Sequence, residues 1–122
     1  MGKKFILGAL LIVLPTAAQA MDVATFLRKA DALEKKGMTA MFSSDFKLLK
    51  KEVETSSLAL RAERLAAPKA GRRPAYCPPP RSGLNSDEIL AHFRAIPAAR
   101  RPQIQVKEGL LGLLVRKFPC RG

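Results

Sequence analysis

The chain has 122 residues, 22 of them Lys or Arg and 10 Asp or Glu, so its formal net charge is +12. This length predicts one small domain, and a hydrophobic content of 48% is typical of a folded chain. One His and two Cys are too few for an ordinary zinc site, and a His-based catalytic triad could use only His92. No carboxylate pair or nucleophile motif is present. We therefore expect no metal, no cofactor and no enzyme activity.

The first 20 residues are typical of a secretory signal peptide. Lys3 and Lys4 precede an apolar run over residues 5–14, and Ala18-Gln19-Ala20 fits the pattern before a cleavage site. The run is about half of the roughly 20 residues that a bilayer-spanning helix needs, which argues against a membrane anchor. We therefore expect cleavage after Ala20, a periplasmic domain of residues 21–122 and no stable membrane insertion.

Cleavage would remove Lys3 and Lys4 and leave 20 basic against 10 acidic residues, a net charge of +10. A surface this basic attracts polyanions, anionic lipid head groups or acidic proteins. Nucleic acid is rarely met in the periplasm, so we expect no nucleic-acid partner. The alternative, that the basic residues lie on solvent-exposed faces without a binding role, stays open.

Two helices are predicted in the first half of the domain. The first covers residues 23–36, with Asp22 as N-cap, Gly37 at its end and an apolar stripe of Val23, Phe26, Leu27, Ala30 and Leu33. Residues 38–42 are predicted as a short turn or helical link. The second helix covers residues 45–67, capped by Ser43 or Ser44 and ended by Pro68, with a stripe of Phe46, Leu49, Val53, Ser57 and Leu60.

Two more helices are predicted after residue 84. The third begins after Asn85, which with Glu88 forms a capping box, and ends at Ile96; its apolar face is Ile89, Leu90 and Phe93. His92 is expected to be a packed or surface residue. The fourth covers residues 104–118, with a stripe of Val106, Leu110, Leu113, Leu114 and Phe118. No strand-like alternation occurs, so we predict an all-α bundle of about four helices.

Residues 69–83 contain four prolines and two glycines, which exclude regular structure. Two cysteines, an even number in an oxidising compartment, predict a Cys77–Cys120 disulfide that ties the last helix to this central Pro-rich loop. It would close a loop of 43 residues and stabilise the fold by about 4 kcal/mol.

The same loop carries the candidate partner-binding residues. They are basic or aromatic side chains in an irregular segment: Arg72, Arg73, Tyr76 and Arg81. Loops of this length in a small domain are often functional. A covalently tied connection without a binding role explains the segment equally well, so both interpretations stay open.

Residues 71–121 resemble the Rap/Tai family of immunity proteins. The resemblance is carried by Cys77-Pro78-Pro79, a capped helix, Ile96-Pro97 with Arg100-Arg101, and a final helix that closes in Phe118-Pro119-Cys120. It implies a small exported helical protein that neutralises a peptidoglycan amidase toxin delivered by type VI secretion, with a loop plugging the cleft. No contact residue matches a shared motif. Residues 26–33 and 42–45 resemble exported proteobacterial proteins without an assigned role.

Two functions are therefore expected as alternatives. The first is a periplasmic immunity-type protein that binds a secreted amidase and occupies its active-site cleft. The second is a general envelope-stress or chaperone-like helical protein without a toxin partner, similar in size and single disulfide to periplasmic acid-stress chaperones. A homodimer is compatible with either function.

Overall fold

The structure, a computed structural model, describes residues 20–121; the predicted signal peptide lies almost wholly outside the described residues. Within that range the only strand-like pairing is an isolated bridge between Asp22 and Gln105. The predicted all-α fold is confirmed. The α-helices are α1 (Val23–Lys36), α2 (Ser44–Ala66), α3 (Ser86–Ala95) and α4 (Val106–Lys117), and the 3-10 helices are η1 (Gly37–Phe42), η2 (Pro68–Ala70) and η3 (Arg101–Gln103).

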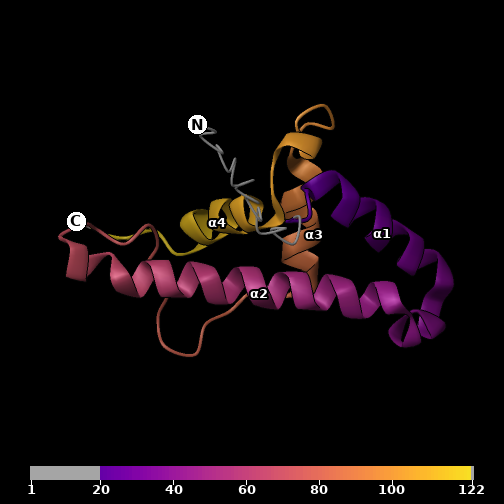
Figure 1. The fold of residues 1–122 in the computed structure, drawn as a ribbon, viewed down its shortest axis with the longest axis horizontal. Helices are drawn as coiled ribbons and strands as arrows, with labels where there is room; N and C mark the ends of the chain where they lie inside the picture. Colours follow the sequence, from indigo (N-terminus) through magenta and orange to yellow (C-terminus); the bar gives the residue numbers. More distant parts are fainter. Residues whose placement is uncertain (1–19, 122) are drawn as a thin grey trace, which may run out of the picture.

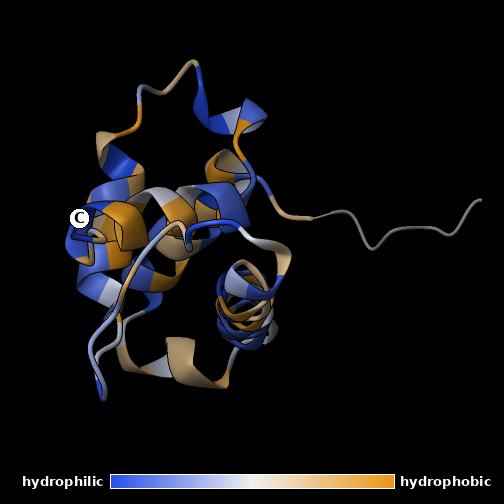
Figure 2. Ribbon diagram, turned by 90° about the vertical axis from the view of Figure 1, so that its left-hand side faces the viewer, coloured by the Kyte–Doolittle hydropathy of each residue, from blue (hydrophilic) through white to orange (hydrophobic). Residues whose placement is uncertain are grey.

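The longest helix, α2, forms one side of the molecule. Helix α4 packs against its C-terminal half and α1 against its N-terminal half, while α3 packs against α1 and α4 (Figure 1). Figure 2, turned by 90°, shows α2 nearly along its axis beside the other helices. The core therefore lies between α2 and the group formed by α1, α3 and α4.

The helix starts are set by local capping. The Asp22 carboxylate accepts hydrogen bonds from the Thr25 amide (2.8 Å) and hydroxyl (2.9 Å), and Ser43 Oγ accepts one from the Phe46 amide (3.2 Å). Asn85 and Glu88 exchange the two bonds of the predicted capping box. These side chains satisfy amides that have no partner in the first helical turn. Ser43 is the N-cap of α2, so the helix begins at Ser44, one residue before the predicted start.

The last helix begins two residues later than predicted. Residues 104 and 105 are extended. The residues on either side of Gln105 pair with those on either side of Asp22: the Val23 amide donates to the Ile104 carbonyl (2.8 Å) and the Val106 amide to the Met21 carbonyl (2.9 Å). The backbone of this segment is therefore used in tertiary pairing. This bridge fastens the beginning of the domain to α4.

The core is centred on Phe93, which is fully buried and packs edge-on against Phe26 with ring centroids 5.3 Å apart. The stripes predicted for α1, α3 and α4 face this core, with Leu90 and Phe118 partly buried at its edge. For α2 the prediction is wrong at two positions: Phe46 is 37% exposed, and Ser56 is buried in place of Ser57. Ser56 lies seven residues after Leu49, two turns along the same face, whereas Ser57 is rotated away by about 100°.

Two glycines in α4 lie against α3 in different surroundings. A Cβ added at Gly109 would come within 2.7 Å of a Phe93 ring carbon and 3.3 Å of a Val23 methyl. A Cβ at Gly112 would meet only the His92 ring, at 3.3 Å. Because Phe93 and Val23 have no exposed surface, they have no room to move, so the absence of a side chain at Gly109 allows α4 to approach the core.

We predict that Gly109→Ala lowers the free energy of unfolding by about 1–3 kcal/mol because it overpacks the core. The matched change Gly112→Ala should stay within about 1 kcal/mol of wild type, since the gain in helix propensity offsets a small shift of His92. Urea denaturation of both variants measures the difference. Equal stabilities would contradict the role assigned to Gly109.

Candidate functional site

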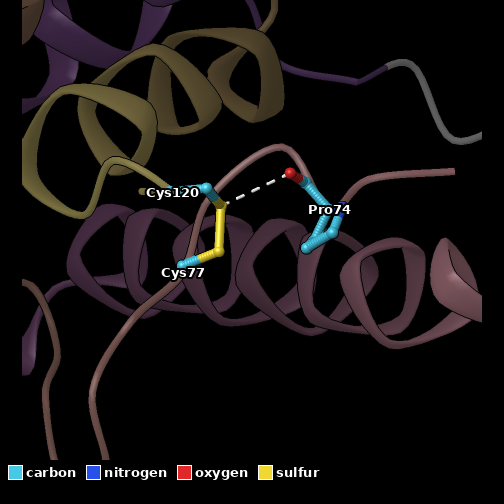
Figure 3. Close-up of a disulfide and its surroundings, with 3 residues drawn as sticks. All are labelled: Pro74, Cys77 and Cys120. Carbon is cyan, nitrogen blue, oxygen red and sulfur yellow. Dashed lines mark hydrogen bonds between the residues drawn. A yellow bond between two sulfur atoms is a disulfide. The ribbon is translucent and has the colours of Figure 1, made fainter. Parts of the chain in front are cut away.

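The loop over residues 71–85 is fixed to the end of α4. The predicted Cys77–Cys120 disulfide is present, with Cα atoms 4.9 Å apart, and the Cys77 amide donates to the Phe118 carbonyl (2.8 Å). The Cys120 sulfur lies 3.5 Å from the Pro74 carbonyl oxygen, and Figure 3 shows the two groups facing each other. This contact is not a hydrogen bond, because a disulfide sulfur carries no hydrogen to donate. Covalent and backbone bonds together give the middle of the loop a fixed position.

The loop begins with a tight turn at the C-terminal end of α2. Gly71 has a positive φ of 70°, which a glycine adopts without strain. In this conformation the Arg72 amide donates to the Ala67 carbonyl (2.9 Å) and caps the last turn. The turn therefore places Arg72 and Arg73, both exposed, beside the end of α2.

Tyr76 requires a correction. Its side chain is only 5% exposed and belongs to the core, so it is not available as a contact residue. The guanidinium of Arg64 lies over its ring, 5.4 Å from the centroid. This cation–π geometry joins the loop to α2. Tyr76 thus holds the loop in place by packing into the core.

A basic hollow of about 320 Å³ opens between the end of α2 and the start of the loop. Arg64, Arg72 and Arg73 line it, and its one acidic residue, Glu63, is paired with Lys107. Arg64 Nε is buried and has no hydrogen-bond partner within residues 20–121. An anionic group seated here would meet guanidinium donors, whose planar fork suits carboxylates and phosphates.

Arg81, the remaining candidate, does not line this hollow. It lies in a turn where the Ser82 hydroxyl donates to the Pro79 carbonyl (2.6 Å). Its φ of 61° is unusual for a residue with a side chain. The structure therefore brings Arg72 and Arg73 together and separates Arg81 from them.

Sequence reasoning missed Arg64, although a signal was present. Arg64 follows Leu60 by four residues and so continues the buried face of α2 with a charged side chain. Its head group needs a partner there, and the Tyr76 ring provides one.

A second concave surface, which the sequence analysis did not predict, is an apolar groove of about 500 Å³ between α1, α2 and the start of α3. Phe26, Leu33, Phe46, Val53 and Leu90 are among its walls. Phe46, predicted as a core residue, remains 37% exposed at its edge. The groove is a surface for apolar groups and has few polar ones to direct chemistry.

His92 occupies a half-buried position between α3 and α4. Its Nδ1 is buried without a hydrogen-bond partner in the described part of the chain. Burial, and next the positive charge of Arg116, lower the pKa of His92 below its ordinary value. Together with His92, Arg100 and Glu108 line a hollow of about 340 Å³. Within residues 20–121 no three His, Cys, Asp or Glu side chains are placed to hold a metal ion.

Comparison with known proteins finds no matching family model, no matching curated protein and no matching solved structure. None of the helices within residues 20–121 is long and apolar enough to cross a membrane. The disulfide indicates an oxidising compartment.

We predict that the protein loses stability on mild acidification. Because the pKa of His92 is lowered in the folded state, the unfolded chain binds more protons, so the stability present above the ordinary pKa of 6.5 is lost as the pH falls below it. The melting temperature should therefore drop between about pH 7.5 and pH 5. His92→Gln should flatten this dependence, whereas an equally steep dependence in the variant would contradict the assignment.

The carboxylates of Asp22 and Glu88 affect the stability of the fold at lower pH than His92 does. The Thr25 amide bond lowers the pKa of Asp22, and the Lys117 hydrogen bond lowers the pKa of Glu88. Their contributions are present above their ordinary pKa values of 3.8 and 4.5 and are lost only below them. The two ranges can therefore be separated in one pH series.

Removal of the disulfide tests how firmly the loop is held. Replacing both cysteines, Cys77→Ser with Cys120→Ser, should lower the free energy of unfolding by about 2–5 kcal/mol. The double change avoids a free thiol, and reductant added to the wild type should reproduce the loss. Thermal melts of the three samples make the comparison. An unchanged melting temperature would show that Tyr76 and the backbone bonds hold the loop without the disulfide.

Proposed function

We propose that this chain is a periplasmic immunity-type binding protein that neutralises a peptidoglycan amidase toxin by occupying its active-site cleft. The observation that carries the proposal is the basic loop over residues 71–85, which the disulfide and Tyr76 anchor to two helices. The resemblance of residues 71–121 to the Rap/Tai family adds the class of partner.

The anchoring supports an inhibitory role on physical grounds. A loop that is ordered before binding loses little conformational entropy when it enters a cleft, so more of the contact energy becomes affinity. The Cys77–Phe118 backbone bond and the turn at Gly71 fix the loop on both sides of Tyr76. A segment held in this way can plug a cleft without doing chemistry there.

The charge of the loop supports an acidic partner surface. Arg72 and Arg73 are exposed beside the hollow that Arg64 lines. Arginine is enriched among residues that dominate binding energy at protein interfaces. We infer that a carboxylate of the toxin enters this hollow while the rest of the loop fills the cleft. Association would then slow as salt rises, because steering is screened beyond about 8–10 Å.

The chaperone-like alternative is favoured by one different observation, the apolar groove between α1, α2 and α3. An unfolded client could place an apolar segment there. A client-aggregation assay separates the two functions: Val53→Ser, in the groove wall, would reduce protection by a chaperone and leave amidase inhibition unchanged.

We predict that Arg72→Ala with Arg73→Ala weakens amidase binding about tenfold or more, which corresponds to about 1.4 kcal/mol, with an unchanged melting temperature. The matched control is Arg28→Ala with Lys36→Ala, which removes two exposed charges from α1. The partner is first captured from the periplasm of the producing cell, and affinity and inhibition are then measured with each variant. Arg81→Ala, tested alone, shows whether the separated part of the loop contributes.

Two outcomes would contradict the proposal. If the processed protein captures no amidase, the partner class is wrong. If the control variant weakens binding as much as the loop variant, binding follows net charge and the loop is only a connection.

A further inference from the structure

The 3-10 helix η1, at the end of the molecule where α1 turns into α2, exposes three large apolar side chains. Met38 and Phe42 are each 87% exposed and Met41 is 62% exposed. Figure 1 places this turn at the N-terminal end of α2, whereas the residues that line the basic hollow lie at its C-terminal end. Small proteins commonly expose single apolar side chains, but a contiguous group of large ones marks an interaction site.

The backbone of η1 is held in place. Ala40 is buried against the core, and its carbonyl accepts a hydrogen bond from the Ser43 amide (3.0 Å). The Thr39 hydroxyl donates to the Lys36 carbonyl (2.9 Å). With Ala40 turned inward, the segment is fixed so that Met38, Met41 and Phe42 project outward. Their exposure is therefore a property of the fold.

Lysines surround this apolar tip in the sequence and along both helices that meet there. Two precede it at the end of α1 and two follow in the first turns of α2: Lys35, Lys36, Lys47 and Lys51. None of the four forms an ion pair within residues 20–121. The nearby acidic residues are engaged elsewhere, Asp45 with Lys29 (3.1 Å) and Glu34 with Arg94 (2.8 Å). The tip therefore combines projecting apolar groups with uncompensated positive charge.

We propose that η1 and its flanking lysines dock the protein on an anionic phospholipid surface. Met38, Met41 and Phe42 would enter the boundary between head groups and acyl chains, and the four lysines would stay at the level of the phosphates with their stems along the apolar surface. Each lysine near an anionic leaflet strengthens binding roughly fivefold at low salt.

The charge pattern favours lipid over the other occupants. A second copy docked through this tip would bring four lysines against four, and like charges repel. A protein partner would need a pocket for a projecting tip and a ring of acidic groups around it. A fluid anionic bilayer meets both conditions without a special shape. This proposal does not depend on the proposed function, because the tip and the basic hollow lie at opposite ends of α2.

The test uses the processed protein and Phe42→Trp as a probe. The chain has no Trp, so the substitution introduces a unique fluorophore at the tip. Vesicles that contain phosphatidylglycerol should shift its emission to the blue, and brominated acyl chains should quench it. Vesicles of phosphatidylcholine alone should bind at least tenfold more weakly, and added salt should release the protein.

A matched pair of variants separates insertion from general stickiness. Met38→Ser with Phe42→Ser should reduce co-sedimentation with phosphatidylglycerol vesicles at least tenfold. Leu58→Ser with Leu65→Ser removes two exposed apolar side chains from α2 (66% and 52% exposed). This control should leave co-sedimentation with the vesicles unchanged. Lys35→Gln with Lys36→Gln should weaken binding with the tip intact.

Three results would overturn the proposal. One is the absence of a blue shift on anionic vesicles. Another is equal binding to phosphatidylcholine, which would show that the lysines are irrelevant. The third is a dimer in analytical ultracentrifugation that Phe42→Ser dissociates, which would assign the tip to a second copy of the chain.

Discussion

The close approach of α4 to the other helices at Gly109 determines the rest of this fold. Phe93 fills the space that a side chain at Gly109 would occupy, and it packs at the same time against Phe26 of α1. Three helices therefore meet at one fully buried ring. Because α4 is fixed there, its end is fixed too, and the Cys77–Cys120 disulfide carries that position to the central loop. The orientation of the loop arginines thus depends on a contact in the core.

Features set by neighbouring residues could be predicted from the sequence. The caps at Asp22 and Asn85 depend on amides three residues away, and the helical stripes depend on spacing alone. The disulfide followed from the number of cysteines and the expected compartment. The features that were missed depend on contacts between distant residues. Tyr76 turns inward under Arg64, and the extended segment just before α4 pairs with Met21 and Val23.

The candidate site shows the same division. Arg72 and Arg73 could be selected because they lie in a segment that cannot be helical. The hollow beside them could not be predicted. Its third arginine, Arg64, comes from a helix, and its wall includes Tyr76, which the sequence analysis had expected to be a contact residue. The groove and the tip were missed for a different reason. Apolar residues in a small protein are expected in the core, and only the fold shows that Ala40 takes the buried position of η1 while Met38 and Phe42 project.

Helix α2 relates the two proposed surfaces to each other. It has 23 residues without an interior glycine or proline, so it is a continuous rod about 35 Å long. The apolar tip precedes its first turn, and the last turns of α2 form one wall of the basic hollow. A protein docked on lipid through the tip, with α2 upright, would hold Arg72 and Arg73 roughly 30 Å from the head groups, beyond about three Debye lengths at physiological salt. The membrane would then not compete with an acidic partner for these two arginines.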